Sequence, residues 1–566
     1  MEFIVFASVI IAIVFLFFTI EGVRERNRRK EYQKNLYKRN PRILHKKHTA
    51  ERYSKIPGYF KRHETKDSID DITWNDLEMD RIFKSIDTTM SASGEEYLYY
   101  RLRTPFMEEE EIKVLERDVQ YFEENEKSRV DAQMILHDQG GTGKYSLCDY
   151  LKFIVELEKQ SNMPHIIADL LLIVCIVISI LGFYEGIWGL IIIICYNLIT
   201  YSKYKSNMEP YLISIHYIVK MMDTCKKLIK ADAKACVEQQ EKMKENLSSL
   251  KMISSGFGIF LGNGQMSMSG NPLELLNDYM KMIFHCDIIA FNMMIAKIKN
   301  RVDEIEGLFS AIGYYDYVIA IGNFRYEKGE ECCIPEFVNA KEGQDDSVSL
   351  EITDGYHPLI EKPVKNSFST KKGMLITGSN ASGKSTFLKM TAINALLAQT
   401  LNTCTATSYK APFFRILSSM SLRDDLGSGE SYYIVEIKAI RRILEKAEED
   451  SAPILCFVDE VLRGTNTVER IAASTEILKS LSGQKVLCMA ATHDIELTRL
   501  LEKEYRNFHF DEQIMDDDIY FSYLLKEGRA TTHNAISLLK LIGYSSSITQ
   551  KAEDLAKHFT ETGNWE

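Results

Sequence analysis

A glycine-rich loop followed by lysine and two hydroxyl residues lies in the C-terminal half of the chain, at Gly378–Thr386. Its letters, GSNASGKST, fit G-x-x-x-x-G-K-[ST], a pattern whose backbone cradles nucleotide phosphates. The apolar run Met374–Thr377 precedes it, and a helix is predicted from Ser385 to about Gln399, so the helix N-terminus adds its partial positive charge. Lys384 is expected to reach the β- and γ-phosphates, and the Ser385 hydroxyl to ligate Mg²⁺.

The whole loop is therefore predicted to bind the phosphates of a nucleoside triphosphate. The expected contact residues are Gly378, Ser379, Asn380, Ala381, Ser382, Gly383, Lys384, Ser385 and Thr386.

Two later apolar runs each end in polar residues suited to phosphoryl transfer. Ile454–Val458 leads to Asp459 and Glu460; we expect the first to hold Mg²⁺ through water and the second to polarise the attacking water. A second predicted strand, at 485–491, ends in Thr492-His493-Asp494. His493 alone would more often be structural, but one strand after a carboxylate pair it is predicted to bond the γ-phosphate.

A further glycine-rich turn lies between these segments, at 424–431, and ends in Ser431. A helix through Arg441 and Arg442 is predicted to follow, which makes the turn a candidate anion-binding helix start. Because it lies far along the chain from the first loop, it could serve a nucleotide held by another subunit.

Composition narrows the class of protein. The chain has 566 residues and a net charge of −11, which argues against non-specific coating of nucleic acid, although a local basic surface remains compatible. Its 11 cysteines show no C-x-x-C spacing, and several lie in apolar runs. A reduced, cytosolic catalytic compartment without a zinc site is expected.

Three apolar segments are unusual for a soluble enzyme: Phe3–Ile20, Ile166–Phe183 and Ile187–Thr200. Arginines and lysines follow the first and flank the outer ends of the other two, so the positive-inside bias puts all these flanks in the cytoplasm. The sequence predicts an anchor plus a transmembrane hairpin turning at 184–186, in a multi-pass plasma-membrane protein with a cytoplasmic nucleotide site. The alternative is a buried core helix pair.

Four segments together resemble the ATPase motifs of the MutS family: 378–386, 424–431, 458–467 and 490–497. Gly355-Tyr356-His357-Pro358 is similar to that family's entry to the domain, with Tyr356 in place of an arginine. The resemblance implies an α/β P-loop ATPase domain of the ABC type that uses ATP and Mg²⁺. It also implies a homodimer in which Ser431 completes the partner's site. Asn380 would contact the γ-phosphate, and Tyr523 would stack on adenine.

The resemblance also suggests how the chain is organised. Residues 1–65 would form the membrane anchor and a basic stalk, 66–345 an all-α core and lever region interrupted by the hairpin at about 166–200, and 346–566 the ATPase domain with a C-terminal helical dimerisation region. The first 65 residues are too short for the family's mismatch-recognition domain.

Two functions remain open from the sequence. In the first, a membrane-anchored MutS-like ATPase couples ATP hydrolysis to binding of mismatched or branched DNA. In the second, the ATP cycle drives a conformational switch in the membrane or in a protein partner, with no role for DNA. The basic residues of 24–47 suit lipid headgroups better than DNA, because they directly follow the first apolar segment.

Overall fold

The structure is a computed structural model that describes residues 2–46, 48–141, 146–157, 161–251, 279–280, 282–338, 348–379, 382–420, 432–449, 452–463, 465–483, 485–515, 518–530, 536, 539–540 and 542–565, with the backbone alone at some helix and strand positions. It divides into two compact units. The first comprises 1–64, 87–100 and 117–323, and the second 65–86, 101–116 and 324–566.

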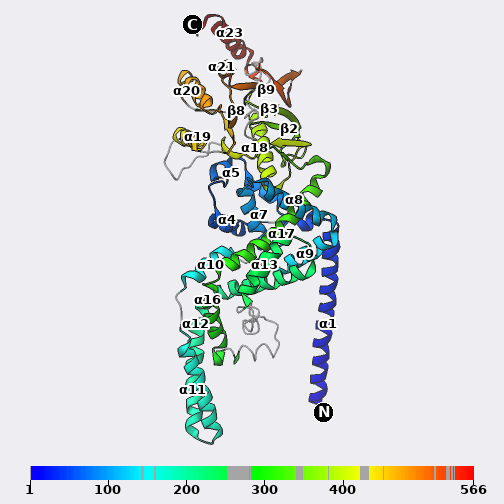
Figure 1. The fold of residues 1–566 in the computed structure, drawn as a ribbon, viewed down its shortest axis with the longest axis vertical. Coiled ribbons are helices and arrows are strands. Elements are labelled where there is room, and N and C mark those ends of the chain that lie inside the picture. The colour runs from blue at the N-terminus through cyan, green and yellow to red at the C-terminus, as the bar shows by residue number, and fades with distance from the viewer. Residues whose placement is uncertain are drawn as a thin grey trace. The chain divides into compact units, whose positions relative to one another are not determined.

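Helices build the described part of the first unit (Figure 1). Those with residues in it are α1 (Glu2–Tyr37), α2 (Pro41–Leu44), α3 (Ala50–Tyr53), α4 (Gly58–His63), α7 (Ala92–Arg103), α8 (Glu109–Glu124), α9 (Glu126–Gln139), α10 (Leu147–Glu156), α11 (Met163–Ile180), α12 (Tyr184–Ala231), α13 (Val237–Ser249), α16 (Cys286–Ile298) and α17 (Val302–Lys328).

Close packing of α7 against α17 organises the centre of this unit. A side chain at Gly94 would lie 2.2 Å from the carboxylate of Asp316, so only glycine leaves room for this approach. Asp316 in turn accepts hydrogen bonds from the backbone N–H groups of Met90 and Ser91, at 2.8 and 2.7 Å, just before α7 begins. A buried carboxylate at a helix N-terminus is stabilised by the helix dipole and these orphan donors.

The apolar hairpin of this unit consists of α11 and α12, which lie side by side (Figure 1). Both are long and apolar enough to cross a membrane, and only 17% of each apolar window is buried. A core helix pair would bury most of these side chains. The turn lies at residues 181–183 rather than at the predicted 184–186, because Gly182 adopts the left-handed φ of 90° that ends α11.

The predicted count of three membrane spans is not supported: among the described residues, two helices qualify. The remaining predicted segment, Phe3–Ile20, lies within α1, but most of its side chains fall outside the described residues. It stays a prediction.

The second unit holds all the strands that the structure describes, and they form two sheets. The four-stranded sheet has the order β1-β5-β2-β3, with β1 (Glu336–Phe337), β2 (Leu350–Gly355), β3 (Asn366–Thr370) and β5 (Ser408–Ala411). The six-stranded sheet has the order β10-β9-β4-β8-β7-β6, with β4 (Gly373–Thr377), β6 (Arg415–Ser419), β7 (Ile454–Asp459), β8 (Val486–Ala491), β9 (Tyr505–Met515) and β10 (Asp518–Glu527).

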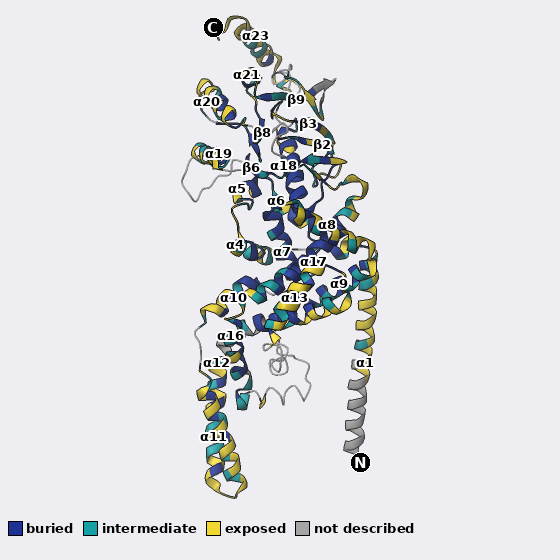
Figure 2. Ribbon diagram, viewed as in Figure 1, coloured by how far each residue is buried: buried dark blue, intermediate teal, exposed yellow. Residues whose placement is uncertain are grey.

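In the larger sheet, every strand pair except β9–β10 is parallel. β4 and β7 are buried along their whole length, as expected for parallel strands covered on both faces, and Figure 2 shows the same dark colour on β8 and α18. The described helices that lie wholly in this unit are α5 (Asp71–Asp76), α6 (Met79–Ile86), the 3₁₀ turn η1 (Gly329–Glu331), α18 (Lys384–Leu401), α19 (Tyr432–Glu449), α20 (Thr467–Ser480), α21 (Ile495–Leu500) and α23 (Ser546–Thr562).

Residues 65–86 and 101–116 belong to this α/β unit, although they are distant from it in sequence. Asp76, at the end of α5, accepts hydrogen bonds from Ser418 Oγ at 2.7 Å and from the N–H of Met420 at 2.9 Å. Arg442 of α19 forms an ion pair with Asp70 at 2.5 Å. Polar contacts to β6 and α19 therefore attach this early segment to the sheet.

A buried charge cluster in the first unit centres on His48. Its Nε2 lies 3.1 Å from Asp87 and its Nδ1 3.1 Å from Glu95, while Arg52 binds Glu95 at 2.7 Å. Burial alone would lower the pKa of His48, but hydrogen bonds to the two carboxylates outweigh it and raise the pKa to about 9. The three ligand-type residues could in principle hold a metal ion. Both ring nitrogens of His48 are already paired with carboxylates, and Arg52 adds a positive charge. The cluster is therefore an ion-pair network rather than a metal site.

We expect His48→Ala to lower the free energy of unfolding by about 3 kcal/mol, because it leaves buried carboxylates without their partner. Since the pKa of His48 is raised above its ordinary 6.5, its contribution is full below pH 6.5 and disappears as the pH rises through about 9. Urea unfolding of detergent-solubilised protein across this range checks both points. The exposed His558→Ala is the control, and an equal loss in the two variants would contradict the assignment.

Candidate nucleotide-binding site

The glycine-rich loop joins the end of β4 to the start of α18, as the sequence predicted. Gly378 has a φ of 149° and Gly383 a φ of 106°, which side chains other than hydrogen rarely allow. A Cβ at Gly378 would also lie 2.8 Å from Ser382 Oγ. The two predicted phosphate contacts Asn380 and Ala381 lie outside the described residues.

Lys384 extends back over the loop. Its Nζ donates hydrogen bonds to the carbonyl oxygens of Gly378 at 2.8 Å and Ser379 at 2.9 Å, and lies 3.3 Å from His493 Nε2. Burial lowers the pKa of Lys384, and the charges of Asp459 and Glu460 oppose that effect. The ammonium is thus fixed at the mouth of the loop, where the negative charge of a phosphate would offset the cost of its desolvation.

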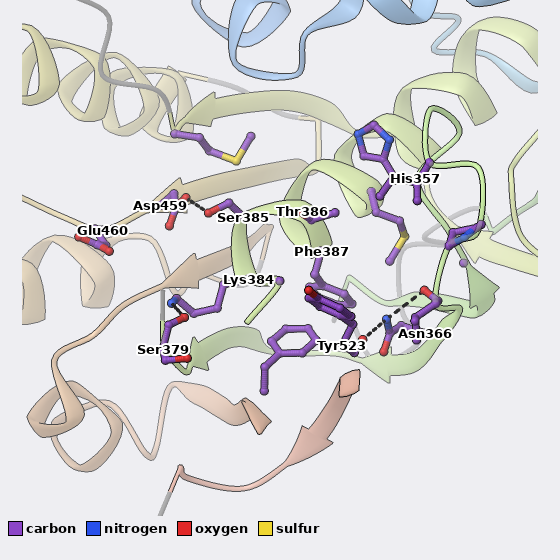
Figure 3. Close-up of a pocket in the computed structure, with 18 of the residues that line it drawn as sticks. His357, Asn366, Ser379, Lys384, Ser385, Thr386, Phe387, Asp459, Glu460 and Tyr523 are labelled. Carbon is purple, nitrogen blue, oxygen red and sulfur yellow. Dashed lines mark hydrogen bonds between the residues drawn. The ribbon is translucent and has the colours of Figure 1, made fainter. Parts of the chain in front are cut away.

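Ser385 and Asp459 are brought together from different elements. The Ser385 hydroxyl, in the first turn of α18, donates a hydrogen bond to Oδ2 of Asp459 at the end of β7 (Figure 3). Asp459 is 8% exposed. A hydroxyl and a carboxylate are hard oxygen donors of the type that Mg²⁺ prefers, so this pair fits the predicted metal position.

Glu460 follows directly and turns away from the strand with a φ of 61°. One carboxylate oxygen lies 3.0 Å from His493 Nε2, and the other lies 2.6 Å from Nε of Arg463. Burial raises the pKa of Glu460, but the hydrogen bond to His493 and the charge of Arg463 outweigh it and lower the pKa below its usual value. The carboxylate is therefore ionised at neutral pH and able to orient a water.

The loop after Glu460 is strained. Leu462 also has a positive φ, of 60°, which costs a non-glycine residue about 1–3 kcal/mol and persists only where the surroundings hold it. Glu436 of α19 supplies such a contact: its Oε1 accepts hydrogen bonds from the N–H groups of Leu462 at 2.5 Å and Arg463 at 3.3 Å.

The loop and the polar residues after β7 and β8 line one cavity of about 630 Å³, large enough for a nucleotide. Lys384, Ser385, Asp459, Glu460 and His493 lie around it together with Ser379, Gly383, Thr386 and Tyr523. His357 lies on another wall, where burial and the charge of Lys389 lower its pKa to about 4 and keep it neutral.

Tyr523, the predicted adenine contact, lies beside the loop: a Cβ at Gly383 would be 3.2 Å from its ring (Figure 3). A register shift between Phe521 and Leu525 sets its position in β10. There the amide of Asn366 bonds both the carbonyl oxygen of Tyr523, at 3.0 Å, and the N–H of Leu525, at 2.8 Å. Tyr523 is 43% exposed and lines the cavity, so its ring is available for stacking.

Ser431, predicted to serve a partner's nucleotide, lies outside the described residues together with 421–430. Conversely, sequence reasoning missed Arg463, His357 and Glu436, and also Glu512, whose carboxylate accepts a hydrogen bond from Ser379. Arg463 follows the carboxylate pair by three and four positions, a signal that could have identified it. His357 lies in the Gly355–Pro358 segment noted from the sequence, but no local signal places it, Glu436 or Glu512 at the site.

Comparison with known proteins identifies the C-terminal region. Residues 374–560 match the model of MutS domain V. The chain is also similar to the DNA mismatch repair protein MutS of Aquifex pyrophilus, with 31% identity over 274 residues. That alignment covers 46% of this chain and 30% of the relative, so the chain spans less than a third of the protein it matches. The C-terminal α/β domain is thus a match to MutS domain V, and the aligned part of the chain is similar to the MutS family.

Proposed function

We propose that the protein is a membrane-anchored ATPase that binds and hydrolyses ATP with Mg²⁺ in a homodimeric, composite site. The observation that carries the proposal is the convergence of Lys384, the Ser385–Asp459 pair and the Glu460–His493 pair on one cavity. Phosphate binding, metal binding and water activation each have a residue of suitable chemistry there.

Each side chain has one task in this proposal. Lys384 exchanges its two loop carbonyls for phosphate oxygens and neutralises their charge. Ser385 and Asp459 hold Mg²⁺, which supplies further positive charge to the phosphates. Glu460 accepts a hydrogen bond from the attacking water, and His493, already in contact with Glu460, bonds the γ-phosphate. Tyr523 stacks on the adenine ring.

The site is proposed to be completed by Ser431 of a second copy of the chain, as the MutS resemblance implies. Membrane attachment is supported by the exposed apolar hairpin of α11 and α12 and by the apolar start of α1. The basic residues that follow in α1 would lie at anionic headgroups, with the ATPase on the cytoplasmic side.

Two processes are candidates for what the ATP cycle drives. Binding of mismatched or branched DNA is supported by the name of the MutS relative. A membrane or partner switch is supported by α12, which continues without a break from the hairpin into contact with α9, α10 and α16 of the first unit. A continuous helix can transmit displacement along its axis.

Lys384→Ala should weaken ATP binding by about 10- to 100-fold, because it removes charge-assisted hydrogen bonds to the phosphates. Titration with a fluorescent ATP analogue measures the change. Lys371→Ala, an exposed lysine of the same domain, is the matched control. Unchanged affinity in the Lys384 variant would contradict the loop assignment.

Glu460→Ala should retain ATP but hydrolyse it at least about 100-fold more slowly, because the water loses its general base. Phosphate release measures turnover, and light scattering after size exclusion should find an ATP-trapped dimer. Exposed Glu469→Ala is expected to behave like wild type. Normal hydrolysis by the Glu460 variant would show that the base has been assigned wrongly.

Detergent-purified protein should shift mismatched or branched DNA more than perfect duplex in gels, and ATP should change that binding. The parallel arm measures ATPase activity in anionic and neutral lipid vesicles without DNA. Failure to bind every DNA at physiological salt would remove the DNA candidate. Stimulation by vesicles alone would then favour the membrane switch.

A further inference from the structure

Glu436 connects α19 to the loop that carries the proposed general base. It lies one turn into the helix and is 7% exposed. Its Oε1 accepts hydrogen bonds from the N–H groups of Leu462 and Arg463. Its Oε2 has no hydrogen-bond partner among the described residues. Burying a carboxylate oxygen without a partner costs free energy, which the hydrogen bonds to Leu462 and Arg463 must offset.

The backbone that Glu436 contacts is strained. Glu460 and Leu462 both have left-handed φ angles, which neither side chain favours. Without Glu436, the N–H groups of Leu462 and Arg463 would lose this acceptor, and the segment would be free to relax toward negative φ. Glu460 begins this segment, and the side chain of Arg463 at its end neutralises Glu460.

The metal and phosphate ligands have supports of their own besides Arg463, whose guanidinium lies 3.6 Å from Oδ1 of Asp459 and 3.4 Å from its carbonyl oxygen. Asp459 is held by the pairing of β7 with β8, where it lies opposite Ala491, and the N–H of Glu460 bonds the carbonyl oxygen of Ala491 at 2.9 Å. Lys384 is held by its own loop. A disturbance at Glu436 should therefore reach the carboxylate of Glu460 and the guanidinium of Arg463 but spare nucleotide affinity.

We propose that Glu436 is a positioning residue for hydrolysis, which fixes the backbone of Leu462 and Arg463 and thereby aims Glu460 at the attacking water. This inference rests on the proposed ATPase function and adds to it a residue on a separate helix.

Two substitutions of similar volume test the proposal. Glu436→Gln keeps an oxygen acceptor for the two N–H groups, whereas Glu436→Met removes it. We expect Met to lower kcat by about 10- to 100-fold, the scale of a misplaced catalytic group, and Gln to restore most of the activity. The affinity for an ATP analogue should stay within about twofold of wild type in both. Glu448→Ala, exposed on the same helix, is the control.

Combination with a variant of Glu460 supplies a readout that a merely structural role would not move. Adding Glu436→Met to Glu460→Ala should cause no further loss of turnover, because the aimed group is already gone.

Equal losses of affinity and kcat in Glu436→Met, or a further loss of turnover when it is added to Glu460→Ala, would overturn the proposal. If Glu436→Met does not fold, Glu436→Gln decides: a loss of activity as large as that of Glu460→Ala would show that an acceptor is not sufficient. Absence of ATP hydrolysis by the wild-type protein would instead refute the proposed function.

Discussion

Parallel pairing of β4, β8 and β7 is the constraint on which the candidate site depends. In parallel strands all carboxyl ends reach the same sheet edge, so the loop after β4, the carboxylates after β7 and the histidine after β8 must meet there. The register places Asp459 opposite Ala491, two residues before His493. Residues separated by more than a hundred positions in the chain thus become neighbours because of the strand pairing alone.

The strained backbone after β7 and the charges around it determine the chemistry available at this sheet edge. The left-handed conformations at Glu460 and Leu462 direct the second carboxylate away from the first, so that Asp459 bonds Ser385 while Glu460 bonds His493. Neighbouring cations keep Glu460 ionised despite burial. A buried acceptor on α19 maintains the strained segment, which makes the base sensitive to a helix that is not part of the sheet.

The first unit follows different physics. Its described regular elements are helices, and its interior contains buried ionic groups. Burial raises the pKa of Asp316, at the start of α7, to about 6 despite its hydrogen bonds, whereas in the His48 cluster the partners of the histidine outweigh its desolvation. The α11–α12 hairpin instead exposes apolar side chains that no described part of the chain covers. Such exposure is costly in water and favourable in lipid, which is why the hairpin supports membrane attachment.

The sequence by itself determined the features that local patterns encode: the phosphate loop with its two glycines, the strands β4, β7 and β8, and the apolar segments of the hairpin. Backbone conformation and periodicity are local properties, so short segments report them. Tertiary structure alone placed Glu436 under Leu462 and His357 beside the cavity, attached residues 65–86 to the α/β unit, and turned the hairpin at Gly182. Those outcomes depend on which distant surfaces pack together, because hydrogen bonds and burial across the fold act between residues that no sequence window contains.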